Sequence, residues 1–421
     1  MFSRRPFIQE VFGSIFTQSL LSVTSFIIGI LVARGTSKSE YGIYVICFAV
    51  TQVFLSLQNA LVNTPLMVLL PSKESKGGEW LVSGLAFGQW VILVPLLVVC
   101  GSGLMFYKSF GSDHSILVAL GAVLFAIPTS YMREFLRVLY YCHIRIDYIL
   151  VMDAAFVISA LSGMFLLGKA GSMSASNVIL ILGSAYLLSA VLGYKISYQG
   201  FQFNVSWIKR SFRETWQYSR WSLIGIAVTN AQSYGFVFVV SLILGLQATA
   251  DLSAARLLLM PFGVCISSSQ RIFVAKGSKV LAHNGRESLR KLLFSFLVFF
   301  SGAWICYGLA LLFFHKVVIA NLLTSKYDNI DGYLTLMGVF FLVNSYSFLA
   351  GLCLQVFREF KNLAMYGLIS AISMLALCVY LTSVMGSEGA LVAAILGEMV
   401  LLVLLGARLV RLLGFKKRFV Y

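Results

Sequence analysis

A few ionisable residues lie inside long apolar runs of this sequence, where a charge is costly to keep. Arg133, Arg137 and Arg256 are the cations of this kind, and Glu398 is the deepest carboxylate. An arginine in such a run is a candidate anion-binding residue, because its planar guanidinium grips phosphate oxygens in a bidentate way. A buried carboxyl group can take up and release a proton, because burial favours its neutral form. Anion binding and proton exchange are therefore the chemistry that these residues predict.

Each of these residues also has a simpler interpretation. Arg256 lies just inside the end of its run, so it can equally extend its head to the membrane surface. Arg133 and Arg137 lie one helical turn apart and are either anchors at the cytoplasmic surface or a basic mouth that captures an anion. Glu398 is either a coupling residue or a static partner in an interhelical bond. We expect Asp153 to pair with a nearby arginine.

Polar side chains with helical spacing form stripes on the first and second apolar runs. The stripes line a hydrophilic cavity or serve helix packing, and both interpretations stay open. Two amides one turn apart favour the cavity, because amides need several partners and lipid provides none. Positions about half the chain later carry similar small or polar residues, which indicates an internal repeat. Arg271, beside Gln270, adds a cation. The stripes are Gln52, Ser56, Asn59 and Asn63, matched by Gly263, Ser267, Gln270 and Val274, and Ser14, Gln18 and Ser22, matched by Gly225, Thr229 and Ser233.

The elements that carry these residues are membrane-spanning helices. Of the 421 residues 59% are hydrophobic and only 11% charged, and the mean hydropathy is +0.89. Apolar runs of this length cross a bilayer, and in lipid only helices pair every backbone group within one segment. We expect an all-α polytopic protein with about 12 transmembrane helices at 11–33, 41–70, 81–107, 115–141, 149–168, 177–199, 219–244, 251–275, 291–315, 331–357, 362–384 and 389–412.

The positive charge is distributed unevenly over the loops between these runs. Most of the 32 lysines and arginines fall in the N-terminus, the C-terminus and alternate loops, which marks the cytoplasmic side. Both termini are therefore expected to be cytoplasmic, and the net charge of +16 reflects this topology rather than a nucleic-acid partner. The basic and aromatic stretch near the midpoint suggests a linker. We expect an N-terminal six-helix lobe at 1–200, a cytoplasmic amphipathic linker at 201–218 and a C-terminal six-helix lobe at 219–421.

Other kinds of chemistry find little support. The seven cysteines are scattered and form no Cys-x-x-Cys pair, and the four histidines form no cluster, so we expect neither a metal nor another cofactor. Enzymes that act on sugars place acids and bases in sizeable outer loops. The expected loop 316–330 has only Asp328 as an acid near His315. An enzyme is therefore not expected, and a membrane glycosyltransferase or ligase is the weakest alternative.

The stretch from Phe12 to Pro65 resembles a known family. Its polar-striped first helix, the Ala33-Arg34 exit and the motif Glu40-Tyr41-Gly42-x-Tyr44 are similar to the polysaccharide-transporter branch (Wzx-like oligosaccharide flippases) of the multidrug/oligosaccharidyl-lipid/polysaccharide (MOP) flippase superfamily. The resemblance implies two pseudo-symmetric six-helix lobes around a central cavity lined by the first, second, seventh and eighth helices. Where the second half would repeat Tyr-Gly-x-Tyr, the sequence reads Leu252-Ser253-Ala254-Ala255, so the repeat has decayed there.

The function that this resemblance implies is translocation of a lipid-linked oligosaccharide, a polyprenyl-diphosphate sugar, by alternating access. The membrane would be the bacterial cytoplasmic (inner) membrane, and the product would feed surface or exopolysaccharide synthesis, including O-antigen. Membrane lipid, a polysaccharide polymerase or synthase, and glycosyltransferases are the implied partners. A multidrug cation antiporter of the same superfamily and a polysaccharide exporter paired with a synthase are the alternatives. The expected cavity residues are Gln18, Gln52, Asn59, Asn63, Arg133, Arg137, Arg256, Gln270 and Arg271, with Glu398 as the coupling residue.

Overall fold

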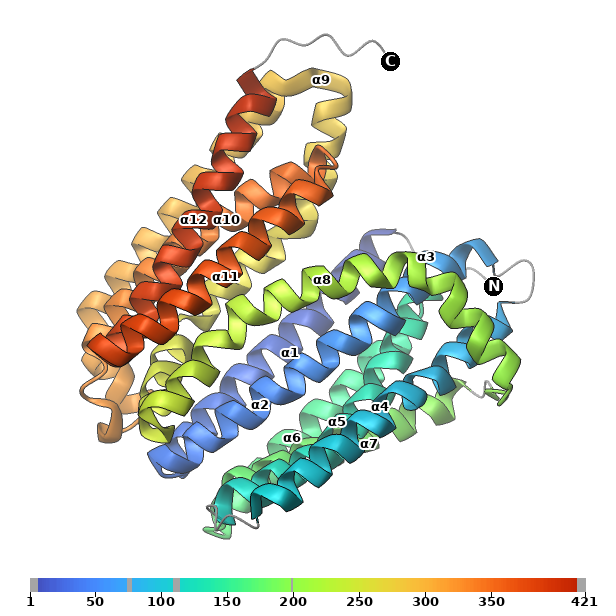
Figure 1. Ribbon diagram of the computed structural model, residues 1–421, viewed down its shortest axis with the longest axis horizontal. Coiled ribbons are helices and arrows are strands. Elements are labelled where there is room, and N and C mark those ends of the chain that lie inside the picture. Colours follow the sequence, from blue (N-terminus) through green and yellow to red (C-terminus); the bar gives the residue numbers. More distant parts are fainter. Residues whose placement is uncertain (1–6, 74–77, 109–113, 198–199, 415–421) are drawn as a thin grey trace. The chain divides into compact units, whose positions relative to one another are not determined.

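A computed structural model describes residues 7–73, 78–108, 114–197 and 200–414. The described chain is almost entirely helical, as the apolar runs predict. Figure 1 shows the helices of each part of the chain running side by side. The elements are α1 (Phe7–Gly35), α2 (Lys38–Gln58), η1 (Asn59–Asn63), α3 (Thr64–Lys73), α4 (Glu79–Lys108), α5 (His114–Cys142), α6 (Ile146–Lys169), α7 (Ala175–Ser197), α8 (Val205–Leu244), α9 (Leu246–Leu322), η3 (Ser325–Tyr327), α10 (Asp331–Val356), α11 (Phe360–Met385) and α12 (Ser387–Gly414).

Eleven helical segments of the described chain are long and apolar enough to cross a membrane. They match eleven of the twelve expected spans within a few residues, except that one runs over the longer range Lys276–Leu322. The expected span 251–275 is helical as the first part of α9 but is not among the eleven, and the side chains of 265, 267–272 and 275 lie outside the described residues. Large apolar side chains cover the outside, with Leu242 86% and Phe313 78% exposed, as expected for contact with lipid. The protein is an all-α, multi-pass membrane protein.

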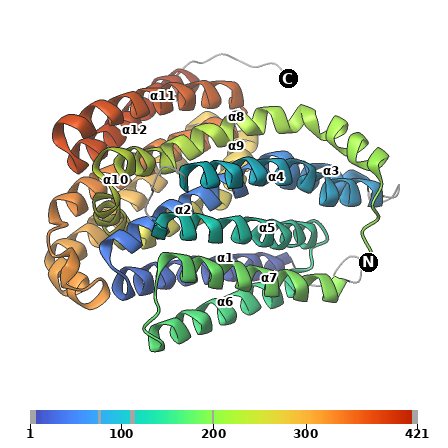
Figure 2. The same ribbon diagram turned by 60° about the horizontal axis from the view of Figure 1, so that its bottom comes forward.

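The chain forms two compact units, unit 1 at 1–227 and unit 2 at 228–421. The boundary between them lies within α8, which continues without a break from the expected linker into the expected seventh span. In unit 1, α7 packs on α5 and α6, α2 packs on α5, and α1 packs on α6, as Figures 1 and 2 both show. In unit 2, α10 packs on α9 and α12, and α11 packs on α12.

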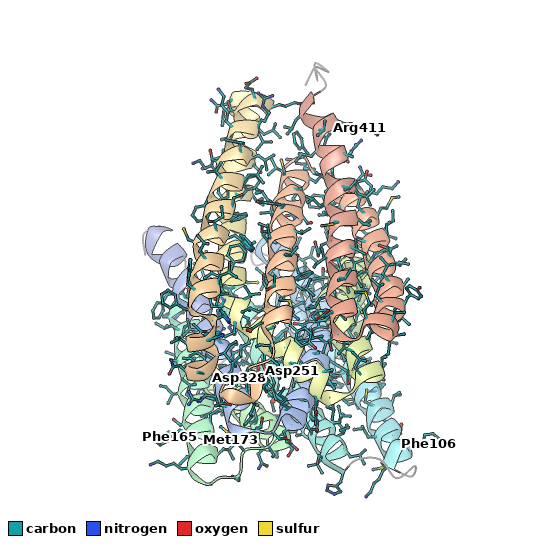
Figure 3. All side chains as sticks on the ribbon, turned by 90° about the vertical axis from the view of Figure 1, so that its left-hand side faces the viewer. Phe106, Phe165, Met173, Asp251, Asp328 and Arg411 are labelled. Atoms are coloured by element: carbon teal, nitrogen blue, oxygen red, sulfur yellow. The ribbon has the colours of Figure 1, made fainter. Side chains whose placement is uncertain are left out.

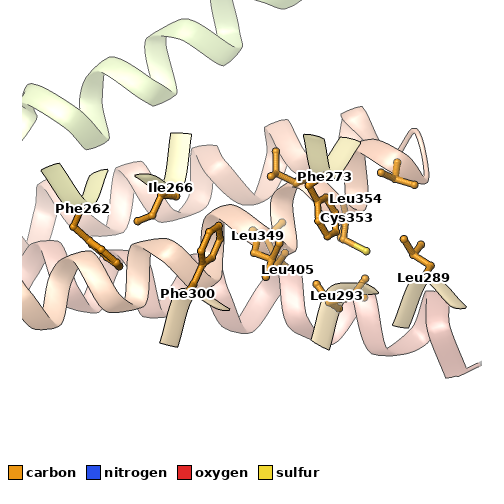
Figure 4. Close-up of a cluster of buried hydrophobic side chains, with 14 residues drawn as sticks. Phe262, Ile266, Phe273, Leu289, Leu293, Phe300, Leu349, Cys353, Leu354 and Leu405 are labelled. Carbon is orange, nitrogen blue, oxygen red and sulfur yellow. The ribbon is translucent and has the colours of Figure 1, made fainter. Parts of the chain in front are cut away.

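Unit 2 has a core rich in phenylalanine that joins α9, α10 and α12 (Figure 4). Phe273 and Phe300 are fully buried, and Phe296 lies edge-on to both, with ring centroids 5.0 Å and 6.2 Å away. Figure 1 shows α9 turning back on itself, and the turn is at Gly285, whose φ of 74° and ψ of −172° are conformations that only glycine adopts readily. The two arms of α9 therefore both reach this core, with Phe273 on one and Phe300 on the other.

The conspicuous motif at the start of α2 has a structural role within unit 1. Ser37 caps α2, since its hydroxyl accepts the Glu40 backbone N–H at 3.2 Å. The Glu40 carboxylate in turn accepts the backbone N–H of Ala175, the first residue of α7, at 2.6 Å. Tyr41 and Tyr44 beside it are buried. The motif thus ties α2 to the N-terminus of α7, where an unpaired N–H and the helix dipole both favour a carboxylate.

Candidate functional site

The most concentrated charge in unit 1 is a buried cluster of two arginines and two carboxylates. Arg133 Nη2 lies 2.7 Å from Asp153 Oδ1, and Arg133 Nη1 lies 2.7 Å from Glu134 Oε1. Arg137 donates to Glu134 Oε2 at 3.0 Å and to Asp153 Oδ2 at 3.2 Å. The exposed fraction of the side chain is 3% for Arg133 and 0% for Asp153. The expected pairing of Asp153 with an arginine is confirmed, and we call these four residues the ion cluster.

Three helices hold the ion cluster in place. Arg133 and Arg137 lie one turn apart on α5, Asp153 comes from α6, and Ser189 of α7 accepts from Arg133 Nε at 3.3 Å. The Arg133 guanidinium also lies over an aromatic ring of α6, 4.5 Å from the Phe156 centroid. Because both arginines already bind carboxylates, capturing a phosphate would require them to exchange partners. As described, the cluster fastens α5, α6 and α7 together.

The amides expected on the second span lie on a single turn of π-helix. Asn63 Nδ2 donates to Asn59 Oδ1 at 2.7 Å; Asn59 is exposed, whereas Asn63 is buried. A π-turn inserts an extra residue into the helix and is frequent at functional sites. The sequence stripe assumed an unbroken α-helix, so the structure changes how these two amides lie relative to the residues before them.

Two buried glutamines beside this turn were missed by the sequence analysis. Gln58 Nε2 donates to Gln89 Oε1 and to the Tyr131 carbonyl, both at 2.8 Å, so it joins α2, α4 and α5. Tyr131 returns a bond from its hydroxyl to the Phe54 carbonyl at 2.6 Å. Within the described chain, Gln58 Oε1 is buried and has no hydrogen-bond partner. The sequence did contain a signal for this pair, because Gln58 and Gln89 are amides inside the second and third apolar runs. They lie outside the polar stripe described above.

The remaining expected cavity residues are distributed over both units. Gln18 on α1 is exposed and Gln52 on α2 is half-buried. Arg256 is half-buried on α9, donates to the Ser233 carbonyl of α8 at 2.9 Å, and lies 5.7 Å from the Tyr234 ring centroid. Arg256 therefore joins α8 and α9 within unit 2. The side chains of Gln270 and Arg271 lie outside the described residues.

Glu398 lies at a polar junction of four helices in unit 2. It is 4% exposed on α12, and the Ser347 hydroxyl of α10 donates to its backbone carbonyl at 3.2 Å. Ser370 of α11 donates to the adjacent Gly397 carbonyl at 2.8 Å and accepts from Gln232 of α8 at 3.0 Å. In the described part of the chain, Glu398 Oε2 is buried without a hydrogen-bond partner. A carboxyl group in this setting can hold a proton, because the buried anion is incompletely compensated.

The described residues contain no group of three or more His, Cys, Asp or Glu side chains that could hold a metal ion. The groups that the described residues bring together form ion pairs and hydrogen bonds. These groups are the ion cluster, the amides around η1, Arg256, and the junction at Glu398.

Comparisons with known proteins reveal the fold. The sequence matches no family profile and no curated protein. The structure is similar to a multidrug resistance MATE family transporter of the MOP superfamily in an inward-facing conformation, with a TM-score of 0.71, 12% identity, and 94% of this chain and 96% of that chain covered. It is equally similar to the lipid II flippase MurJ in an inward closed conformation, with a TM-score of 0.71, 17% identity, and 95% and 87% covered. The chain has the fold of the MOP-superfamily transporters.

The likeness extends over both units, since each comparison covers more than nine tenths of this chain. An outward-facing structure of a MATE family transporter covers 97% of the chain with a TM-score of 0.56 and 12% identity. The fold of the whole chain agrees with the fold that the resemblance of Phe12–Pro65 implies. At these identities the fold is what the chains share, and membership of the superfamily and of a branch within it belongs to the proposal that follows.

Proposed function

We propose that this protein is a flippase that moves a lipid-linked oligosaccharide, with an anionic diphosphate between lipid and sugar, across the bacterial cytoplasmic membrane. The fold shared with the lipid II flippase supports transport of a lipid-linked substrate. The observation that carries the choice of an anion is the state of the carboxylates of unit 1. Glu134, half-buried on α5, and Asp153, fully buried on α6, are both paired with arginines.

A cation exporter needs a carboxylate that can pair with its substrate. In unit 1 the ion cluster already uses both of these carboxylates, and removing a partner from a buried carboxylate is costly. The helices instead offer amides at Asn59 and Asn63 and a cation at Arg256. Amides hydrogen-bond sugar hydroxyls, and a guanidinium binds phosphate. This set of groups suits a glycosylated diphosphate better than an organic cation.

The proposed setting follows from the charge distribution in the sequence. Both termini are cytoplasmic in this proposal, and the substrate enters from that side after glycosyltransferases have built it. A polymerase or synthase on the outer side then consumes it. The two lobes, 1–200 and 219–421, alternate access to a central cavity, with 201–218 as the linker. Gln18, Gln52, Gln270 and Arg271 are further cavity residues in this proposal.

Energy for the cycle would come from the membrane potential or from protons. Moving one charge through the full potential changes the free energy by about 2.3 kcal/mol per 100 mV, so a dianionic headgroup that leaves a negative interior gains roughly twice that. Glu398 is the proposed proton carrier, because it is buried where α8, α10, α11 and α12 of unit 2 meet.

The test is flipping of a polyprenyl-diphosphate oligosaccharide in vesicles that contain the purified protein. Arg256→Gln is compared with Lys316→Gln, which removes the same charge from an exposed position. We expect wild-type transport, unchanged transport in the control, and a large loss in Arg256→Gln. Unchanged transport in Arg256→Gln would keep the flippase and leave Arg256 a contact between α8 and α9.

The rival function is multidrug cation export, which the equally strong likeness to the MATE transporter supports. The same vesicles distinguish the two. Efflux of a cationic dye without flipping of the lipid-linked sugar would replace the proposal by the multidrug alternative. Export of a nascent polysaccharide would instead require a synthase in the same membrane, and a vesicle with the purified protein alone would then flip nothing.

A further inference from the structure

The first turns of α8 form an amphipathic surface segment, defined here as 205–220. Asn204 caps it, since Asn204 Oδ1 accepts the Ser206 backbone N–H at 2.9 Å. Ile208, Ser211, Thr215 and Ser219 are buried on one face. Lys209, Arg213 and Trp216 are exposed on another, at positions i, i+4 and i+7, which places them on one side of the helix. We call these three residues the basic face of α8.

The buried face of this segment is fixed on α4. A Cβ at Gly84 would lie 2.6 Å from the Trp207 carbonyl oxygen, and a Cβ at Gly88 would lie 2.5 Å from the Phe212 ring, so only glycine lets the two helices approach this closely. Ser83 Oγ of α4 also accepts the Gln202 backbone N–H at 3.3 Å. The segment is therefore a built part of unit 1, and its outer face has a fixed direction.

One arginine of the segment belongs to this attachment rather than to the outer face. Arg210 lies 4.1 Å from the Trp80 ring centroid and pairs with Glu214 at 3.3 Å. Lys209 and Arg213 have no carboxylate of the segment on their face, because Glu214 is bonded to Arg210. The basic face thus combines two exposed cations with Trp216, whose exposed fraction is 54%.

We infer that the basic face of α8 docks on the anionic phospholipid headgroups of the bilayer in which the protein lies. Lysine and arginine beside a membrane attract anionic headgroups, and tryptophan favours the boundary between headgroups and acyl chains. The exposed Phe203, just before the segment, and Val205, its first residue, add apolar side chains suited to the same boundary. The inference does not depend on the transported substrate, so it holds or fails independently of the proposed function.

Hydrogen exchange of the full-length protein in nanodiscs tests this docking. One set of discs contains only phosphatidylcholine, and the other also contains phosphatidylglycerol. Two cations near an anionic surface should slow exchange of the amides at 205–220 by about 25-fold, because each contributes roughly a factor of five. High salt should remove the difference, since the attraction is screened.

Two double variants make the test specific. Lys209→Gln with Arg213→Gln should abolish the dependence on phosphatidylglycerol. Lys276→Gln with Lys279→Gln, at exposed positions of α9, removes the same charge elsewhere and should keep it. Equal exchange of 205–220 in both kinds of disc would overturn the inference. So would an equal loss of the phosphatidylglycerol dependence in both double variants. Slowing reproduced by inorganic phosphate in phosphatidylcholine discs would also overturn it, in favour of a site for a free anion.

Discussion

Asp153 is the residue on which the ion cluster depends most, because both arginines of the cluster donate to it. In Asp153→Asn, two buried cations would share the one carboxylate of Glu134. Breaking a buried pair on one side typically costs about 3–5 kcal/mol, because a charge is left without compensation. We therefore expect a strong decrease in the melting temperature of Asp153→Asn in detergent.

The double variant Arg133→Gln with Asp153→Asn is the control for this prediction. It leaves one cation, Arg137, with one anion, Glu134, so its charge balances again. We expect the double variant to be more stable than Asp153→Asn alone, as a double-mutant cycle of coupled residues requires. Additive losses would show that the cluster contributes by shape and not by charge.

In unit 2, Glu359 at the turn between α10 and α11 pairs with Arg408 of α12. Arg408 Nη2 lies 2.7 Å from Glu359 Oε1. The hydrogen bond from Arg408 holds the pKa of Glu359 below its ordinary value of 4.5, with Asn362 contributing another. A carboxyl whose folded-state pKa is lowered stabilises the fold above the unfolded-state pKa, and this contribution is lost as the pH falls through the folded-state pKa.

We expect the difference in melting temperature between the wild type and Glu359→Gln to depend on pH. At neutral pH the variant should melt at a slightly lower temperature, because half-exposed ion pairs contribute little. As the pH falls below 4.5 the two melting temperatures should approach each other, and they should coincide once the pH is below the lowered folded-state pKa, where the wild-type carboxyl is neutral too. Thermal unfolding in detergent at a series of pH values measures this, and a constant difference down to acid pH would contradict it.

At the scale of elements, the caps and turns decide where helices begin and reverse. The Glu40 carboxylate satisfies the first N–H of α7 from a different helix. Replacing a helix-capping acceptor typically costs about 1 kcal/mol. Glu40→Ala should therefore speed hydrogen exchange at 175–178, whereas Glu79→Ala, at the exposed start of α4, should leave that stretch unchanged. Unaltered exchange in Glu40→Ala would show that α7 does not need this cap.

Gly285 allows α9 to reverse direction. Its φ of 74° with ψ of −172° costs other residues about 1–3 kcal/mol, and a Cβ there would meet no atom, so strain of the backbone is the whole effect. Gly285→Ala should lower the melting temperature. Gly302 lies in the same helix, and a Cβ there would also meet no atom. Gly302→Ala should leave the melting temperature unchanged or raise it, because alanine is the better helix former. Equal effects of the two substitutions would contradict a special backbone at Gly285.

The elements were predictable to different degrees. The spans follow from length and hydropathy alone, because lipid forces each long apolar run into a helix. The pairing of Arg133 with Asp153 was foreseen only in kind, because the rotation of α5 against α6 is set by packing across many residues. Gln58 was missed because it lies off the face that carries Gln52 and Ser56, and the sequence does not show that this second face packs on α4 and α5. The continuity of α8 through the expected linker was likewise invisible, since no sequence signal marks where a surface helix enters the membrane.

At the scale of the whole molecule, the orientation in the membrane is the prediction that the charges make. Within unit 2, Figure 3 places Asp251 and Asp328 at one end of the helices and Arg411 at the other. Segment 276–290 is rich in lysine and arginine, which mark the cytoplasmic side. The end with Asp328 is therefore expected to face outward, and the turn around His283 to face the cytoplasm.

Thiol labelling in whole cells measures this orientation. In a background without native cysteines, Asp328→Cys and His283→Cys both place a thiol at an exposed position. A membrane-impermeant maleimide should label Asp328→Cys in intact cells and His283→Cys only after permeabilisation. The reversed pattern would invert the topology, and Lys209 and Arg213 would then face the outer leaflet. Because the positive-inside rule and the proposed direction of transport both depend on the same loops, this labelling constrains the direction in which a lipid-linked substrate could move.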